Sequence, residues 1–166
     1  MSVGSCLTKI THRPDYPQRR NRQVVFNLPF SSKILIMLID KQKKIKDLKA
    51  EFHQLFPGLK LEFYQGSHHE GEASPARLQL DSELSLAAVQ TIHSSGELRV
   101  QEEMTVAELE QHFLEKFGLN AQVFRRSGNL WLQTSATDHW TLAEQNRKGS
   151  HSEQLFREKE ELDSGL

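Results

Sequence analysis

The spacing of apolar residues predicts a strand, a helix and a second strand early in the chain. Residues 33–39, apolar from Ile34 onward, lie between two serines and Asp40, which predicts a strand buried on both faces. Residues 45–56 place apolar side chains three or four positions apart, which predicts an amphipathic helix that ends at Gly58. Residues 59–63 alternate between apolar and polar side chains, as a half-buried strand does.

A similar order of patterns follows. Residues 76–80 alternate and predict a strand, residues 84–90 predict a short helix, and residues 96–100 predict another strand. Thr105 then begins a second long helix, because Glu108 lies three positions later and completes a capping box. The chain is therefore expected to alternate strands and helices in two successive rounds.

A hairpin and a short helix complete the second round, after the second long helix ends at Gly118. Residues 121–125 and 130–134 predict two strands joined across residues 127–129, since the Gly and Asn in that segment suit a tight turn. Residues 140–145 predict the last short helix.

Two segments of the chain are copies of each other. Ile45 and the apolar positions of the first long helix recur 61 residues later, beginning at Val106. The short helices recur at a separation of 56, so that Leu86 matches Leu142. A single copy of about 60 residues has little stability alone, so we expect the two copies to share one core.

We predict a first repeat over residues 31–100 and a second over residues 96–147, with the strand at 96–100 common to both. Side chains on the buried faces of these elements should form the core. The predicted core residues are Leu35, Met37, Leu48, Phe52, Phe56, Leu61, Phe63, Leu98, Leu109, Phe113, Phe117, Val123, Leu132, Trp140 and Leu142.

The two ends of the chain are polar. Residues 1–30 carry one lysine and four arginines against one aspartate, with three prolines, which predicts a disordered basic arm. Within this arm, residues 24–26 are a candidate short edge strand. Residues 148–166 form a charged tail, either disordered or present as a weakly docked helix.

Composition excludes several classes of protein. Cys6 is the only cysteine, so neither an intramolecular disulfide nor a zinc cluster of cysteines can form. No segment approaches the ~20 apolar residues of a membrane span. The net charge of −1 argues against strong binding of polyanions. Together these features predict a cytoplasmic protein.

Four segments together carry a resemblance to a known family: residues 104–110, 117–119, 123–129 and 137–146. Over roughly residues 33–149 the chain resembles a family of small uncharacterised bacterial proteins. The resemblance implies a repeated β-grasp-like, ubiquitin-like arrangement, and it implies no activity, cofactor or catalytic residue. The expected fold is thus α+β: two fused β-grasp-like repeats, a mixed sheet packed by two long helices, and flexible termini.

One loop carries potential metal ligands: His68, His69, Glu70 and Glu72. Imidazole and carboxylate suit a divalent transition metal, but adjacent histidines on a loop rarely point at one ion, so a solvated loop is favoured. The chain has no Gly-x-Ser-x-Gly elbow and no glycine-rich phosphate loop. We therefore expect no cofactor and no enzymatic activity.

The remaining functional classes are binding functions. We expect a protein-interaction module whose partner is another protein, because a β-grasp-like sheet commonly presents an edge or face to a second chain. The alternative is binding of single-stranded nucleic acid such as RNA, through strand aromatics, nearby arginines and the basic arm. The residues behind this alternative are Phe63, Tyr64, Phe124, Arg125, Arg126 and Trp131. Of these, Arg125, Arg126 and Trp131 are the candidate interaction residues.

Overall fold

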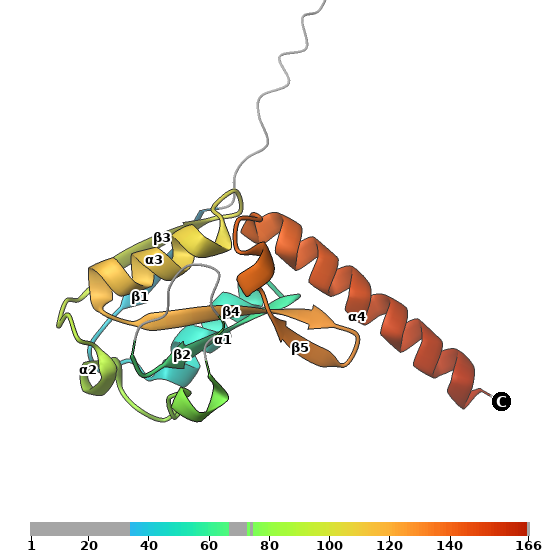
Figure 1. Cartoon of the computed structure of the whole chain (residues 1–166), viewed down its shortest axis with the longest axis horizontal. Coiled ribbons are helices and arrows are strands. Elements are labelled where there is room, and N and C mark those ends of the chain that lie inside the picture. The colour runs from blue at the N-terminus through green and yellow to red at the C-terminus, as the bar shows by residue number, and fades with distance from the viewer. Residues whose placement is uncertain (1–33, 67–72, 74, 166) are drawn as a thin grey trace, which may run out of the picture. The chain divides into compact units, whose positions relative to one another are not determined.

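The computed structural model describes residues 34–66, 73 and 75–165 (Figure 1). The strands are β1 (Ile34–Ile39), β2 (Leu59–Tyr64), β3 (Gly96–Gln101), β4 (Asn120–Ser127) and β5 (Leu130–Gln133). The helices are α1 (Ile45–Leu55), α2 (Leu86–Val89), α3 (Val106–Phe117) and α4 (Leu142–Ser164), with short turns η1 (Ala76–Leu78) and η2 (Ser135–Thr137). The fold is α+β, as predicted. Among the described residues the strands form two antiparallel sheets, β1–β3 and β2–β4–β5, and the single mixed sheet was wrong.

In each sheet, one strand of the first copy pairs with a strand of the second copy so that two equivalent residues lie opposite each other. β1 pairs with β3 so that Met37 lies opposite Leu98, and these residues occupy equivalent positions 61 residues apart. β2 pairs with β4 so that Glu62 lies opposite Gln122, which are equivalent at a separation of 60. A residue that pairs with its own equivalent marks a two-fold axis. The copies are therefore related by an approximate two-fold rotation.

Equivalent backbone hydrogen bonds join each long helix to the short helical segment of its own copy. The amide donates to the carbonyl in every case. These bonds run from Ile45 N to Leu84 O (3.0 Å) and from Leu86 N to Lys43 O (2.8 Å) in the first copy, and from Val106 N to Trp140 O (3.1 Å) and from Leu142 N to Met104 O (2.8 Å) in the second. The repeat in the sequence is thus also a repeat of local structure.

One hydrophobic cluster contains side chains from both copies. Phe52 of α1 and Phe113 of α3 are equivalent residues, and both are fully buried. The ring of Phe113 packs edge-on against Phe63 of β2 with 5.5 Å between centres, so the second copy contacts the first directly. The buried members of the cluster are Met37, Ile39, Ile45, Leu48, Phe52, Phe56, Leu59, Leu61, Phe63, Leu86, Leu98, Val100, Val106, Leu109, Phe113, Phe117, Leu119, Ala121, Val123 and Leu142.

The ends of α3 are as predicted. Thr105 N donates to Glu108 Oε2 at 2.8 Å, and Glu108 N donates to Thr105 Oγ1 at 3.2 Å, which completes the capping box. The backbone hydrogen bond from Thr105 lowers the pKa of Glu108. Gly118 ends the helix with φ at 61°, and a side chain there would overlap Thr91.

Several expected elements are wrong. β1 is not buried on both faces, because its alternate side chains are exposed. Residues 76–80 do not form a strand: η1 occupies residues 76–78, and only Gln79 makes a bridge, to Tyr64. In the predicted core, Leu132 is exposed, and Leu35 and Trp140 are half-buried.

The predicted short helix at residues 140–145 is the start of the much longer α4, which continues through most of the charged tail. Near its start, Asn146 Oδ1 accepts a hydrogen bond from Gly58 N at 2.8 Å, and Gly149 contacts the backbone of Gly58. Ser152 Oγ accepts a hydrogen bond from Gly128 N in the β4–β5 hairpin at 2.9 Å. The helix continues beyond the hairpin (Figure 1). Its residues 157–165 are exposed.

Candidate functional site

The candidate metal ligands His68, His69, Glu70 and Glu72 lie outside the described residues. Within residues 34–66, 73 and 75–165, no group of three or more His, Cys, Asp or Glu side chains could hold a metal ion. The loop therefore stays a candidate known only from its sequence.

Arg126 and Trp131 lie together on the face of the β4–β5 hairpin that points away from the core. They are direct cross-strand partners, and Arg126 Cζ lies 5.1 Å from the centre of the Trp131 ring. Arg126 Nε is 3.9 Å from Glu153 Oε1 on α4. This pair is the part of the predicted interaction site that the structure brings together.

Arg125 points to the opposite face of β4, because successive side chains of a strand alternate between faces. Its guanidinium lies 5.7 Å from the centre of the Trp140 ring. One of its nitrogens, Nη1, donates to Gln145 Oε1 at 3.0 Å. The structure thus separates Arg125 from Arg126 and Trp131, so the three residues do not form one site.

The strand aromatics are largely unavailable for stacking on a nucleic-acid base. Phe63 and Tyr64 are buried. Phe124 and Trp131 are half-buried, and the Lys60 ammonium lies 4.8 Å and 5.5 Å from their ring centres. Cations of this chain already occupy a face of each remaining ring.

Two ionisable side chains of β2, Glu62 and Tyr64, are buried. The Glu62 carboxylate lies 2.6 Å from Lys49 Nζ and 3.3 Å from Lys60 Nζ, and it accepts a hydrogen bond from Gln79 at 2.8 Å. Burial, and then the charge of Glu62, raises the pKa of Tyr64 to about 12. A phenol with so high a pKa keeps its proton near neutral pH, so Tyr64 does not suit a role as a general base.

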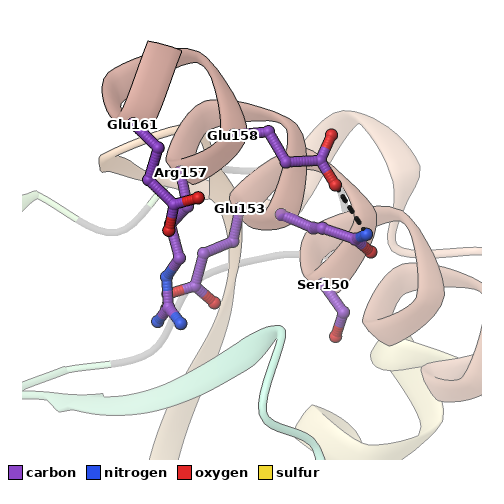
Figure 2. A pocket seen from close by; sticks show the side chains of 6 residues that line it. Ser150, Glu153, Arg157, Glu158 and Glu161 are labelled. Atoms are coloured by element: carbon purple, nitrogen blue, oxygen red, sulfur yellow. Dashed lines mark hydrogen bonds and ion pairs between the residues drawn. The ribbon is translucent and has the colours of Figure 1, made fainter. Parts of the chain in front are cut away.

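A shallow charged hollow follows one side of α4 (Figure 2). Arg157 lies 2.7 Å from Glu153, and Gln154 Nε2 donates to Glu158 Oε1 at 2.8 Å. These pairs are four residues apart, the usual spacing of neighbours on a helix surface. The hollow is a solvated helix face whose side chains pair within the helix or, in the case of Glu153, also with Arg126 of β4, and it points to no ligand.

The outer face of the β1–β3 sheet is a second candidate, which the sequence analysis missed. Ile34, Ile36 and Leu38 point to this face and remain 55%, 52% and 57% exposed. Three large aliphatic side chains in a row on one strand form a contiguous apolar surface of the kind that marks an interaction site. We call these three residues the β1 face.

The second copy shows that the fold does not require this surface to be apolar. The residue equivalent to Ile36 is Glu97, and the residue equivalent to Leu38 is Arg99. Both are exposed on β3, on the same outer face as their cross-strand partners in β1. The same position therefore carries a charge in one copy and an aliphatic side chain in the other.

Among the described strands, β1 pairs only with β3, which leaves its other edge open. Lys43 Nζ donates to Leu38 O at 2.7 Å, so this carbonyl points away from β3. Antiparallel residues alternate between facing the partner strand and facing away, so Ile34 and Ile36 also present their backbone groups to the open edge. The edge is bordered by a groove lined by Leu35, Ile36, Leu38, Glu51, Gln54 and Leu55.

The α1 side of this groove differs between the copies in the same way. Leu55 is 38% exposed in the groove, whereas its equivalent in the second copy is the exposed Lys116. Charged side chains at a strand commonly prevent it from pairing with other chains. β3 has such side chains in Glu97 and Arg99, and Lys116 lies on the neighbouring helix. Among the described residues, Lys43 is the charged side chain that bonds to the β1 edge, at Leu38, and it also pairs with Glu51 at 2.6 Å.

A comparison of the two copies was the sequence signal that could have revealed this site. The run at residues 34–39 is uniformly apolar, while the matching strand at residues 96–101 alternates. Two strands in equivalent places should share a pattern of burial, so the excess apolar residues in the first copy are the exposed ones.

Comparisons with known protein families, with curated proteins and with solved structures find no match for this chain. None of the helices formed by described residues is both long and apolar enough to cross a membrane. Function therefore has to be inferred from the geometry of the sites themselves, and the β1 face has the most distinctive geometry.

Proposed function

We propose that this chain is a non-enzymatic protein-interaction module that binds an extended apolar segment of another protein along the open edge of β1. The observation that carries the proposal is the β1 face, which is aliphatic where the equivalent surface of the second copy is charged. Strand addition fits this geometry, because the same residues offer free backbone groups at the edge and apolar side chains on the face.

The fold, the family and the cellular location that we propose are those that the amino-acid sequence predicts. Two fused β-grasp-like repeats are supported by the strand, helix and strand order within each copy. Membership of the bacterial family is supported by the resemblance over roughly residues 33–149. A cytoplasmic location is supported by the single cysteine of the chain.

Burial of the β1 face supplies a large part of the expected binding energy. Fully burying one Ile or Leu side chain contributes about 1.5 to 3 kcal/mol, so each half-exposed residue of the face contributes about 1 kcal/mol. Each hydrogen bond to the open edge adds about 1 kcal/mol. The groove carries little free charge, since Glu51 is paired with Lys43, so the preferred partner segment is apolar and uncharged.

The test is capture of partner proteins from a bacterial lysate with the wild-type chain and two variants. Ile36→Glu gives β1 the residue that the second copy has at the same position. It should reduce capture at least about tenfold, since losing about 1.4 kcal/mol has that effect. Arg99→Glu is the matched control, because Arg99 is the cross-strand partner of Ile36 but lies away from the open edge.

A captured protein supports the proposal only after identification and purification. It must then bind the wild-type chain and Arg99→Glu with similar affinity, bind Ile36→Glu weakly, and protect the backbone amides of Ile34 and Ile36 from hydrogen exchange. Equal binding by all three proteins, or loss of binding in both variants, would refute docking at the β1 edge.

Binding of single-stranded nucleic acid is the alternative, favoured by the Arg126 and Trp131 pair and the nearby Lys60. The buried Phe63 and Tyr64 weigh against it. Titration of single-stranded RNA and DNA at ~50 mM salt, where phosphate contacts are strongest, tests this function. Binding that is lost in Arg126→Ala would establish the alternative, and undetectable binding would exclude it.

A further inference from the structure

We infer that the chain has a second binding site: a cavity where β2 ends beside the start of β4, which takes a small uncharged ligand with an apolar body and one amide or hydroxyl group. The cavity measures about 580 Å³, and small-molecule sites typically measure about 300 to 1,000 Å³. It shares no described residue with the groove beside β1, so this inference goes beyond the proposed function.

Aliphatic side chains form much of the wall of this cavity. Leu80 and Leu84 come from the segment between η1 and α2, Val89 ends α2, and Leu114 lies near the end of α3. Leu84 and Leu114 remain 39% and 36% exposed. A ligand that covers these side chains removes apolar surface from water, which favours a ligand with an apolar body.

Two buried polar side chains, Tyr64 and Asn120, also line the cavity. They are direct cross-strand partners, so they lie on one face of the sheet. Tyr64 is 4% exposed and Asn120 is 8% exposed. Among the described residues, no hydrogen bond uses the Tyr64 hydroxyl or the Asn120 side-chain amide. Buried polar groups need hydrogen-bond partners, and an amide or hydroxyl group of a ligand would supply them.

The chemistry of the lining favours an uncharged ligand. Of the described residues that line the cavity, none is charged. Burial, and then the charge of Glu62, raises the pKa of Tyr64 to about 12, so its hydroxyl stays protonated and both donates and accepts hydrogen bonds. A charged ligand would lose its hydration in this cavity without gaining an ion pair from the lining, and that loss is costly.

Hydrogen bonds to the backbone hold the walls in place. Leu80 N donates to Phe63 O of β2 at 2.8 Å. Thr91 N and Thr91 Oγ1 donate to Gly118 O at 3.2 Å and 3.1 Å, which joins the end of α2 to the end of α3. The cavity is therefore formed before a ligand binds, as small-molecule sites usually are.

In the second copy, the long helix α4 covers part of the equivalent region. Gly58 is the equivalent of Gly118, and it contacts Asn146 and Gly149 of α4. α2 is the equivalent of the start of α4, but it ends at Val89. The cavity thus exists where the first copy has a short helix in place of a long one.

The buried polar pair is also particular to the first copy. The equivalents of Tyr64 and Asn120 are Phe124 and Lys60, which likewise lie opposite each other. The Lys60 ammonium lies 4.8 Å from the centre of the Phe124 ring, so these two side chains interact with each other. The space and the polar pair are separate differences between the copies, and both suit a small ligand.

The test titrates the full chain with naphthalene-2-carboxamide, an uncharged probe that has an apolar body and one amide, and follows the backbone amide signals by NMR. A ligand of this size should bind with a Kd of about 1 mM or below. The signals of Leu114, Gly118 and Asn120 should shift. Naphthalene-2-carboxylate has the same shape but is an anion, and it should bind at least about tenfold more weakly.

Three variants locate the bound probe. Ala88→Phe places a ring at an exposed position of α2 that lines the cavity, and it should weaken binding at least about tenfold because it fills the space. Ala87→Phe is the matched control, because Ala87 is the preceding exposed residue of α2 and lies outside the lining. Tyr64→Phe removes only the hydroxyl and should weaken binding about fivefold, the effect of one lost hydrogen bond.

Several results would overturn the inference. One is the absence of binding at about 10 mM carboxamide, well above the expected Kd. Others are equal binding by Ala87→Phe and Ala88→Phe, unchanged binding by Tyr64→Phe, or a carboxylate that binds as tightly as the carboxamide. Signal shifts at the cavity that depend on protein concentration without the probe would assign it to a second copy and also overturn the inference. Equal urea midpoints of the two alanine variants show that both are folded.

The cavity and the β1 edge are tested separately. Ile36→Glu should bind the carboxamide as the wild type does, and Ala88→Phe should bind a captured partner protein as the wild type does. Loss of carboxamide binding in Ile36→Glu would overturn the separation of the two sites. The residues named as walls all lie within the described ranges, whereas the predicted basic arm over residues 1–30, with its candidate strand at residues 24–26, lies outside them.

Discussion

Replacing Phe113 with Ala tests whether the two copies share one cooperative core. Phe113 is fully buried, and its ring contacts Phe63 of the first copy. Truncating a buried Phe costs about 3 to 5 kcal/mol. The loss in free energy of unfolding for Phe113→Ala should lie in the upper half of this range, since an edge-on ring pair adds about 0.5 to 1.5 kcal/mol.

Urea unfolding followed by circular dichroism measures this change. With a slope of about 2 kcal/mol per molar urea, a loss of 4 kcal/mol lowers the midpoint by about 2 M. The equivalent variant Phe52→Ala should give a similar shift, because Phe52 is also fully buried. Both variants should show one transition with an unchanged slope, since one core unfolds as a unit.

The exposed Gln111 on the same helix provides the control. Gln111→Ala should move the free energy of unfolding by less than about 0.5 kcal/mol. A midpoint for Phe113→Ala near that of the wild type would refute the placement of Phe113 in the core. Two separate transitions, with only one of them shifted, would refute the shared core.

Two further predictions concern α4 and a surface ion pair. Gly149→Ala should destabilise the protein by about 1 to 3 kcal/mol in thermal unfolding, because the new methyl group overlaps the backbone of Gly58. Gly165→Ala, at the open end of α4, is the control and should leave the stability unchanged. Equal stability of the two variants would contradict the close packing of Gly149 against Gly58. Hydrogen bonds from Lys44 and Lys46 lower the pKa of Glu83 from its ordinary 4.5 to about 2. The ionised carboxylate therefore stabilises the fold above about pH 4.5, and this contribution is lost as the pH falls towards 2. The urea midpoint of Glu83→Gln should lie slightly below that of the wild type at neutral pH and meet it near pH 2, and a gap that persists there would contradict the assignment.

Local signals in the sequence were sufficient wherever one short segment determines its own structure. The capping box of Thr105 and the hairpin turn at Gly128, where φ is 58°, are such cases. Residues 76–80 show the limit of such signals, because alternation over five residues also fits the turn η1 followed by a single bridge at Gln79. The tail was ambiguous because its apolar residues are sparse, although pairs such as Glu153 and Arg157 support a helix.

The sheet was mispredicted because a repeat in sequence does not specify how its copies are arranged. Copies related by translation would place equivalent strands parallel, whereas a two-fold rotation makes equivalent strands run antiparallel where they pair. β1 with β3 and β2 with β4 follow the second rule. The β1 face was missed for a related reason: a continuous apolar run usually belongs to a central strand, and β1 has a neighbour on only one side among the described residues.

The pairing of Glu62 with Gln122 has a consequence for why one chain contains both copies. In a homodimer of the first copy, the carboxylate of Glu62 would face the same carboxylate of the other subunit at the buried axis. Like charges that face each other directly repel, which would weaken the pairing of the two strands. Joining the copies in one polypeptide allows the axial residues to differ, so a carboxylate faces a neutral amide. The covalent link thus removes a like-charge contact that exact symmetry would impose.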